Sequence, residues 1–376
     1  MTRVVLVTGV SRDLGARYAR ALASDDELDV IGVDVTPPRH DLGRVRYVRA
    51  DIRNPVISKV IGNAAVDTVV HMAMVAIPAS AGGRSSMKEI NVIGTMQLLA
   101  ACQKADTVRK LVVQSSVSVY GASPRDPVKF TEEMSPRVQP RTGFGKDSVE
   151  IETYVRGLAR RRPDVVVTTL RLANLMGAGV DSHVARYLSL PVVPTVMGFD
   201  ARLQFLHPTD AVEALLTVTR EDVPGTFNVG AEDVVTLSQA LRMMGRPTVG
   251  VPQLLAPSLA GLVRQARLID FSADQIDALT YGRGMDSSRF TEATGFRPRY
   301  SSRQALEEFV ALAKRGLLAE ERVDHLLDSV ARLLAPQERS CATPRSSSWA
   351  VAAARAEAAG ALRRPRPAAS LGAPRR

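Results

Sequence analysis

The sequence predicts an α/β protein built on a Rossmann-type, doubly wound parallel sheet. Short β-branched runs alternate with helical apolar spacings through the first 173 residues, a rhythm typical of βαβ units. The first run ends in a glycine-containing turn that opens a helix, and the second run ends in an acid, Asp34. This combination is typical of a dinucleotide-binding sheet.

Each element follows from its local pattern. Runs of β-branched and aliphatic residues predict buried strands, which are expected at residues 4–8, 30–33, 45–48, 68–71, 111–114 and 165–170. Apolar residues at helical spacing predict helices at 14–23, 87–101 and 146–158. Because helices connect the strands, the strands should pair in parallel, and ligands are expected at their carboxyl ends.

The rhythm changes after residue 173, where prolines become frequent and the elements shorten. We expect a Rossmann domain over 1–173 with returning elements near 205–230, and a smaller, mixed substrate-binding region over 174–335. Helical patterns in this second part occur at 208–219, 238–244, 303–314 and 320–334. Residues 336–376 are rich in alanine, arginine, proline and serine, a composition that predicts a disordered tail.

The formal net charge of +10 is unevenly distributed. Seven arginines and one acid lie after residue 340, so six of the ten positive charges belong to the tail. The rest of the chain is only mildly basic. Binding of nucleic acid or of an anionic lipid surface is therefore confined to the tail, and it is the less favoured interpretation.

Composition argues against several other classes. The two cysteines cannot form a disulfide framework, and the five histidines have no metal-binding spacing, so we expect no metal. His207 precedes Pro208 and is expected to cap the helix that begins there. No apolar run reaches the length of about 18 residues that a membrane span needs. We therefore expect no membrane association and a reduced, cytoplasmic compartment.

The turn after the first strand is the strongest candidate site. Gly9, Ser11, Arg12, Leu14 and Gly15 would present backbone N–H groups and a helix N-terminus to a pyrophosphate. Arginine stands at position 12, where a GxxGxxG pattern has its middle glycine. The turn departs from the pattern at the residue that normally lets the phosphates approach the backbone.

Two acids follow the next strands. Asp34 ends the second strand, 19 residues after Gly15, where an acid binds the adenosine ribose. Asp51 ends the third strand, where a side chain can meet adenine. A carboxylate about 4 Å from a 2′-phosphate costs on the order of 4 kcal/mol at an effective dielectric constant of about 20, so Asp34 favours NAD over NADP. Arg12 and Arg39 argue the other way, since either could reach a 2′-phosphate.

Six further segments occur in an order that resembles one family. They are HMA at 71–73, NVIGT at 91–95, SSVSVYG at 115–121, RLAN at 171–174, FLHPTDA at 205–211 and TFNVG at 226–230. Over residues 4–309 the chain resembles the NAD-dependent epimerase/dehydratase group of the extended short-chain dehydrogenases/reductases, which includes UDP-glucose 4-epimerase.

The resemblance implies an NAD cofactor and a nucleotide sugar, or a related hydroxyl or carbonyl compound, as substrate. Gly9 and Gly15 would hold the pyrophosphate and Asp34 the ribose. The rest of the implied cofactor site comprises Asp51, Ile52, His71, Met72, Ala73 and Asn91. Ser116 would hydrogen-bond a substrate hydroxyl or carbonyl, and Asn174 would lie beside the substrate. The family often forms dimers through helices corresponding to 87–101 and 146–158, so a homodimer is also implied.

One departure from the family concerns catalysis. The family carries Tyr-x-x-x-Lys on the helix after the SSxxVYG strand, where the ammonium lowers the tyrosine pKa and the phenolate takes a proton. Here Phe144 replaces the tyrosine and Ser148 replaces the lysine. Asp147 could accept a proton if burial raised its pKa; alternatively, it is an acid placed near the helix start by the helix dipole.

Three functions follow from these residues. The first is an NAD-linked oxidoreductase or epimerase (isomerase) in which Ser116 orients the substrate and another group moves the proton. The second, the alternative to it, is a catalytically silent NAD-binding sensor or scaffold. The loss of the tyrosine and lysine favours this alternative, because losing general acid–base help costs about 10²–10⁴ in rate, whereas the intact substrate-side motifs favour the first. The third is binding of nucleic acid or another surface through the basic tail.

Overall fold

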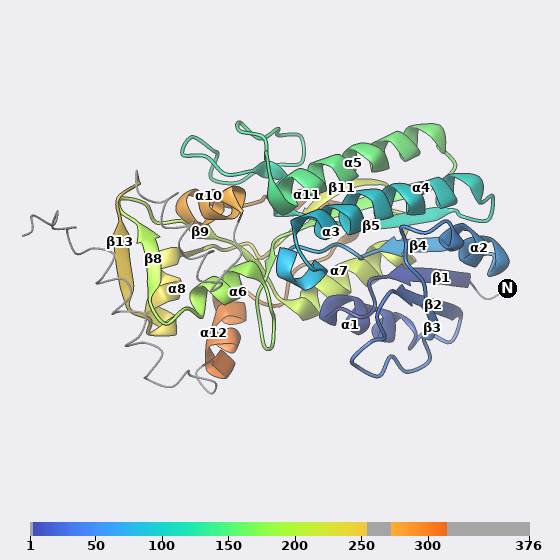
Figure 1. Ribbon diagram of the computed structural model, residues 1–376, viewed down its shortest axis with the longest axis horizontal. Helices are drawn as coiled ribbons and strands as arrows, with labels where there is room; N and C mark the ends of the chain where they lie inside the picture. Colours follow the sequence, from blue (N-terminus) through green and yellow to red (C-terminus); the bar gives the residue numbers. More distant parts are fainter. Residues whose placement is uncertain (1–2, 254–271, 314–376) are drawn as a thin grey trace, which may run out of the picture. The chain divides into compact units, whose positions relative to one another are not determined.

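The computed structural model describes residues 3–253 and 272–313 (Figure 1). Its main sheet has seven strands in the order β11-β6-β5-β4-β1-β2-β3, and all neighbours pair in parallel. The strands are β1 (Arg3–Thr8), β2 (Leu28–Asp34), β3 (Arg46–Arg49), β4 (Thr68–His71), β5 (Lys110–Ser116), β6 (Val166–Leu172) and β11 (Gly225–Val229). The predicted doubly wound sheet is confirmed, and its strand order reverses between β1 and β4.

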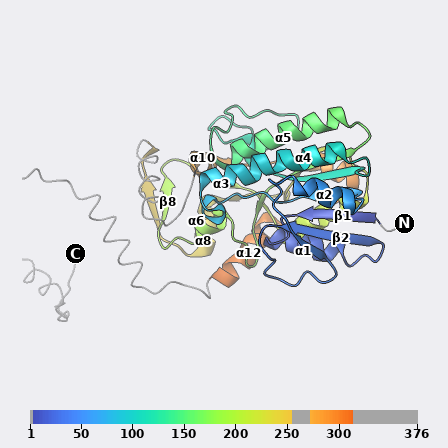
Figure 2. The same cartoon turned by 45° about the vertical axis from the view of Figure 1, so that its right-hand side comes forward.

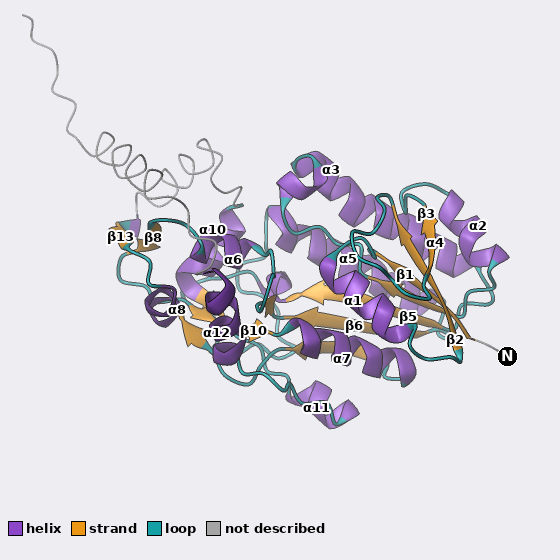
Figure 3. Ribbon diagram, turned by 90° about the horizontal axis from the view of Figure 1, so that it is seen from below, coloured by secondary structure: helices purple, strands orange, loops and turns teal. Residues whose placement is uncertain are grey.

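Helices cover both faces of this sheet. Side chains alternate between the two faces along each strand, and both faces are apolar. Val5 and Val7 of β1 join the core beneath α1 (Asp13–Leu22) and α7 (Pro208–Arg220). Leu6, between them, joins the opposite core. The helices of that second face are α2 (Val56–Asn63), α4 (Thr95–Lys104) and α5 (Gly143–Arg161). Figure 2 shows α4 and α5 side by side, and Figure 3 shows the sheet between the two helical layers.

The helix expected at 87–101 consists of three pieces. A short helix, α3 (Arg84–Lys88), passes into a π-helical turn, η2 (Glu89–Gly94), before α4 begins. Pi-helical turns are rare and commonly mark functional sites. Helix α2 was not predicted, because its eight residues provide only two buried apolar positions.

The second region contains short helices and small sheets around a third apolar core. Its helices are α6 (His183–Leu188), α8 (Leu237–Met244), α10 (Ala273–Tyr281), α11 (Ser288–Thr294) and α12 (Ser302–Ala313). Its strands are β7 (Asn174–Leu175), β8 (Val193–Val196), β9 (Arg202–Leu203), β10 (Phe205–Leu206), β12 (Val235–Thr236), β13 (Thr248–Val251) and β14 (Gly282–Arg283). The patterns at 208–219, 238–244 and 303–314 correspond to α7, α8 and α12, whereas 320–334 and 336–376 lie outside the described residues.

A buried histidine ties β1, β4 and α4 together. The His71 ring contacts the hydroxyls of Thr8 and Thr95, at 2.8 Å on each side. Thr8 Oγ accepts two backbone N–H groups and Thr95 Oγ donates to a carbonyl, so Thr8 donates to Nδ1 and the ring donates from Nε2. This arrangement requires the neutral imidazole, and burial lowers the pKa of His71 to about 4.

The free energy of unfolding should therefore depend on pH through His71. Because the ring titrates near 6.5 in the unfolded chain and near 4 in the folded one, the unfolded chain binds more protons between these values. Stability from this residue is complete above pH 6.5 and declines by about 1.4 kcal/mol per pKa unit of the shift as the pH falls. In urea titrations, His71→Gln should be less stable at neutral pH but show a shallower decline between pH 6.5 and 4. An unchanged pH slope in the variant would contradict this assignment.

A second buried contact joins α1 to α7. The Tyr18 hydroxyl lies 2.7 Å from Thr219 Oγ, which itself donates to the Leu215 carbonyl. Tyr18→Phe should therefore lower the free energy of unfolding by about 1 kcal/mol, measured by urea denaturation. Tyr154→Phe is the matched control, because Tyr154 is exposed on α5 and should change stability little. Equal effects of the two substitutions would show that the Tyr18 bond contributes nothing.

Candidate active site

The carboxyl edge of the sheet collects most of the predicted site residues. The turn at Gly9 follows β1, Asp34 ends β2, Asp51 follows β3 and Ser116 ends β5. These strands are neighbours or near neighbours in one parallel sheet, so their ends lie along one edge. This is the edge at which open α/β sheets bind ligands.

Two glycines permit the sharp turn after β1. Gly9 has a φ of +83°, and a Cβ there would lie 2.8 Å from the Met72 carbonyl group. A Cβ on Gly15 would lie 2.2 Å from the Gly9 carbonyl oxygen. Only glycine fits at either position, and the start of α1 is thereby held against the turn. Leu14 points into the core, so it can serve a ligand only through its backbone. A pyrophosphate is the group that such a turn accommodates.

Ser11 links this turn to the acid that ends β2. Its backbone N–H donates to Asp34 Oδ2 at 3.0 Å, its hydroxyl donates to the Thr36 carbonyl, and the second Asp34 oxygen accepts from Val35 N–H at 2.7 Å. Arg12 is half-buried beside them, and its side chain makes no hydrogen bond or ion pair within the described residues. Burial lowers the pKa of Arg12, and the nearby charge of Asp34 partly opposes that shift.

Asp51 is held by its neighbour Arg53. The guanidinium contacts both carboxylate oxygens at 2.6–3.0 Å, and these bonds lower the pKa of Asp51. Ile52 is buried, and its side chain packs against Gly94 of η2 so closely that a Cβ there would collide with it.

Three residues implied to line the cofactor have buried side chains. His71 is enclosed as described, and Met72 and Asn91 are also buried. Asn91 pairs with both backbone groups of Val75, at 2.7 and 2.9 Å, and its amide donates to Asp147. These side chains therefore shape the loop after β4, and only Ala73 of this group is partly exposed.

The start of α5 shows what replaces the tyrosine and lysine. Phe144 packs partly against the apolar core. Ser148 is fully buried and donates its hydroxyl to the Phe144 carbonyl at 2.8 Å. Asp147 is fully buried as well, and both its oxygens accept Arg84 guanidinium hydrogens at 2.6 Å. This bond raises the pKa of Arg84. The Asp147 carboxylate is thus already hydrogen-bonded and has no exposed surface.

Ser116 stands at the edge above a buried polar network. This residue is half-buried, and its hydroxyl bonds with Ser118 at 3.2 Å. Beneath it, Glu152 accepts from Ser115 at 2.7 Å and pairs with Arg171 through both oxygens, at 2.9 and 2.7 Å. Arg171 also donates to the Tyr120 hydroxyl, which reaches Asn228 Oδ1 at 2.8 Å. Burial raises the pKa of Tyr120, so this phenol stays protonated.

No role was predicted for Arg84, Glu152 or Tyr120. One signal was present: Arg171 interrupts an apolar strand, and a charge in such a position requires a buried partner. The spacing of Glu152 to Arg171 could not identify that partner, because only the packing of α5 on β6 brings them together.

The remaining predicted residues lie further along the edge. Asn174 is half-buried in β7 and pairs with Phe205 of β10. His207 caps α7 as expected: its Nδ1 accepts from Thr209 N–H, and its Nε2 lies 2.7 Å from Glu308. Among the described residues, no cluster of histidine, cysteine and acidic side chains could hold a metal ion. The described helices are also too short or too polar to cross a membrane.

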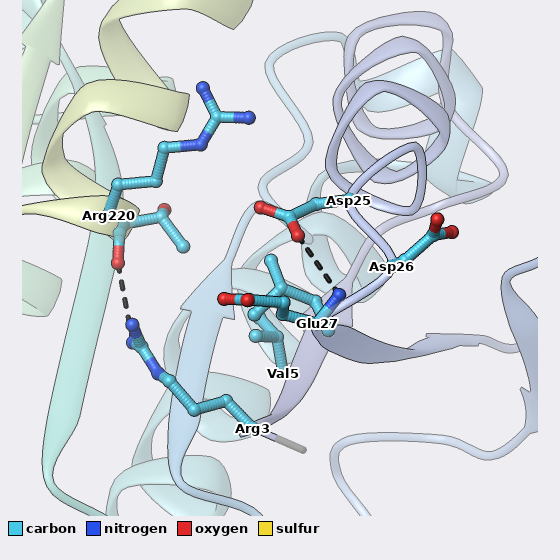
Figure 4. Close-up of a pocket in the computed structure, with 8 residues that line it drawn as sticks. Arg3, Val5, Asp25, Asp26, Glu27 and Arg220 are labelled. Carbon is cyan, nitrogen blue, oxygen red and sulfur yellow. Dashed lines mark hydrogen bonds between the residues drawn. The ribbon is translucent and has the colours of Figure 1, made fainter. Parts of the chain in front are cut away.

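A pocket of about 620 Å³ lies at the opposite edge, where β1 and β2 begin (Figure 4). Arg3 of β1 donates to a carbonyl near the end of α7. Asp25 accepts from the Glu27 N–H group just before β2 begins. The full length of the strands separates this pocket from the glycine turn, so it is not part of the candidate site.

Sequence comparison identifies a family and relatives whose sequences resemble this chain. The profile of the NAD dependent epimerase/dehydratase family matches residues 5–230. An uncharacterised protein of Mycobacterium tuberculosis is 47% identical over 312 residues, covering 82% of this chain and 83% of that protein. UDP-glucose 4-epimerase of Corynebacterium glutamicum is 28% identical over 296 residues, covering 68% and 84%.

Solved structures show the same fold. MoeE5 in complex with UDP-glucuronic acid and NAD has a TM-score of 0.65 at 24% identity, covering 83% of this chain and 99% of its own. UDP-glucose 4-epimerase of Thermotoga maritima with UDP-glucose has a TM-score of 0.64 at 19% identity, covering 84% and 100%. The family profile spans more than half of the sequence, and this protein therefore belongs to the NAD dependent epimerase/dehydratase family.

Proposed function

We propose that this protein binds NAD along the carboxyl edge of its sheet and takes a nucleotide sugar, or a related hydroxyl or carbonyl compound, beside Ser116. The observation that carries the proposal is the glycine turn: Gly9 and Gly15 tolerate no side chain, and they lie at the same edge as Asp34 and Ser116. When bound, NAD supplies a hydride acceptor. The region expected over 174–335, apart from the elements near 205–230 that return to the main sheet, would bind the substrate, with Asn174 beside the ligand.

Asp34 supports NAD rather than NADP as the cofactor. Its carboxylate is fixed by two backbone amides and faces the position of the adenosine ribose in a dinucleotide site. A fixed negative charge repels a 2′-phosphate. Arg12 carries the opposite charge nearby, so Arg12 and Asp34 together would set the preference.

Within this proposal Ser116 orients the substrate and α5 supplies no proton acceptor. Ser116 is half-buried at the end of β5, and its hydroxyl makes only two hydrogen bonds, both of 3.2 Å, with Ser118 within the described residues; a ligand at this edge could replace them. Phe144 has no titratable group, and Ser148 donates to the backbone of its own helix. Any proton transfer would use another group or a water molecule.

A catalytically silent sensor or scaffold is the second candidate. The ion pair between Asp147 and Arg84 favours it, because the one acid on the relevant part of α5 is buried and already engaged. Either candidate would act in the cytoplasm. Cys102 is consistent with it, since this cysteine is free and buried and its thiol pKa is raised by burial.

Purified protein tests the two candidates directly. Bound NAD, identified after release by acid or heat, is expected for both. Adding a panel of UDP-sugars should then produce NADH absorbance if hydride transfer occurs. NAD binding with no absorbance change for any sugar would favour the silent candidate, and the absence of NAD binding would overturn the proposal itself.

Restoring the family pair should reveal a functional pocket. Phe144→Tyr combined with Ser148→Lys replaces a phenyl ring and a hydroxyl by the acid–base pair, so turnover of a bound nucleotide sugar should rise by roughly 10²–10⁴. Phe144→Tyr alone is the control: without the ammonium the tyrosine pKa stays high, and little gain is expected. Sugar binding without any gain in the double variant would argue against a catalytic pocket.

A homodimer through α4 and α5 is part of the proposal. Ile93 of η2 and Met96 of α4, three positions apart, are 43% and 41% exposed. Such a pair of apolar side chains is typical of an interface. Met96→Glu should convert the dimer into a monomer in light-scattering measurements, whereas Val128→Glu, in an exposed loop, should not. A monomeric native protein would contradict this part.

A further inference from the structure

Arg283 is a buried cation without a counter-ion. It lies in β14, beside β9, and only 7% of its surface is exposed. Within the described residues its guanidinium makes one hydrogen bond, from Nη1 to the Gly121 carbonyl oxygen at 3.0 Å. Within the described residues no carboxylate lies close enough to form an ion pair with it. A guanidinium has five N–H donors, so most of them are unused.

Arg171 provides the comparison within the same protein. It is buried to the same degree, at 9% exposure, yet Glu152 satisfies it through two hydrogen bonds. Burying a charge without a partner is costly, and proteins generally pair such groups. The contrast indicates that the negative charge that pairs with Arg283 comes from a bound molecule and not from a described side chain.

The neighbouring acids are engaged elsewhere. Asp126 accepts from the backbone and hydroxyl of Ser123, and Asp274 accepts from Thr142. Both act on Arg283 only through space, as does Asp277. Burial lowers the pKa of Arg283 to about 10, so it still carries its charge at neutral pH.

A buried histidine lies within electrostatic range of the same guanidinium. His183, the first residue of α6, is 9% exposed, and its ring makes no hydrogen bond within the described residues. Burial and, to a smaller extent, the charge of Arg283 lower the pKa of His183 to about 4. The ring is therefore neutral and carries one N–H donor and one acceptor nitrogen.

The unpartnered nitrogens of both residues keep some exposed surface. The free nitrogens of Arg283 and His183 are not among the fully enclosed polar atoms that lack partners. Gly121, whose carbonyl oxygen accepts from Arg283, directly follows η3 (Val117–Tyr120), whose N-cap is Ser116. The Arg283 guanidinium therefore contacts the chain at Gly121, at the end of the turn that begins with the substrate-orienting Ser116.

We propose that Arg283 and His183 bind an anionic group of the substrate, a carboxylate or a phosphate. A planar guanidinium matches either group through two parallel N–H bonds, and a neutral imidazole adds a third donor. This inference rests on the proposed function. It adds that, among hydroxyl and carbonyl compounds, the protein would prefer substrates that also carry a negative charge.

The test uses the full chain, with and without saturating NAD, and follows thermal unfolding at constant ionic strength. The probes are inorganic phosphate, glucuronate, UDP-glucose and UDP-glucuronic acid. Native protein should be stabilised saturably by at least one of them. Arg283→Gln should weaken that response by about 10- to 100-fold in apparent affinity, and Arg283→Lys and His183→Gln by less. Arg297→Gln is the control, since Arg297 forms an exposed pair with Glu232.

The outcomes separate the possibilities. A response to glucuronate identifies a carboxylate, and one to phosphate a phosphate. Without a probe, Arg283→Gln should unfold at or above the native temperature, because it removes an unpaired charge; marked destabilisation would instead indicate a structural role and overturn the inference. It also falls if Arg283→Gln answers every probe as the native protein does, or if no probe stabilises the native protein. An Arg283-dependent phosphate response without NAD or nucleotide-sugar binding would retain this site and refute the proposed function.

Discussion

The ion pair between Glu152 and Arg171 fixes the geometry of the whole candidate site. It joins the middle of α5 to the end of β6. Both side chains are buried, so water cannot take the place of either partner. Breaking such a buried pair typically costs several kcal/mol, so α5 is held at one height along the sheet. Ser115, the neighbour of Ser116, bonds to the same carboxylate, and Tyr120 bonds to the same guanidinium. The serine turn and the start of α5 are thereby placed relative to each other by one pair of charges.

The parallel sheet was predictable from sequence because it depends on local patterns. Runs such as the one before Gly9 are apolar on both faces, as strands buried between two helical layers must be. The boundaries moved by one to three residues, since polar ends such as Arg3 and Ser116 extend the pairing beyond the apolar run. The π-helical turn could not be foreseen: Asn91 lies in it because its amide pairs with Val75, a tertiary contact that leaves no periodic signal.

The site was only partly predictable for the same reason. Gly9, Asp34 and Ser116 could be located because each sits at the end of a strand, and strand ends share an edge. The state of Asp147 could not be inferred. Its partner Arg84 lies 63 residues earlier, and nothing in the helix pattern indicates that the two meet. The replacement of the tyrosine and lysine could be read from the sequence. The ion pair beside them could not, because it forms only when Arg84 of α3 reaches Asp147 of α5.

The contact between Asp274 and Thr142 affects how the chain can fold during synthesis. Thr142 precedes α5 and has no cap of its own, and the carboxylate that bonds to its backbone N–H comes from α10, 132 residues later. Similarly, β6 gains its outer neighbour only when β11 has been made. A ribosome-bound chain that ends before residue 225 therefore has an open sheet edge and an uncapped α5. Chaperone protection of that edge would matter most during this interval of translation, since exposed strand edges promote aggregation.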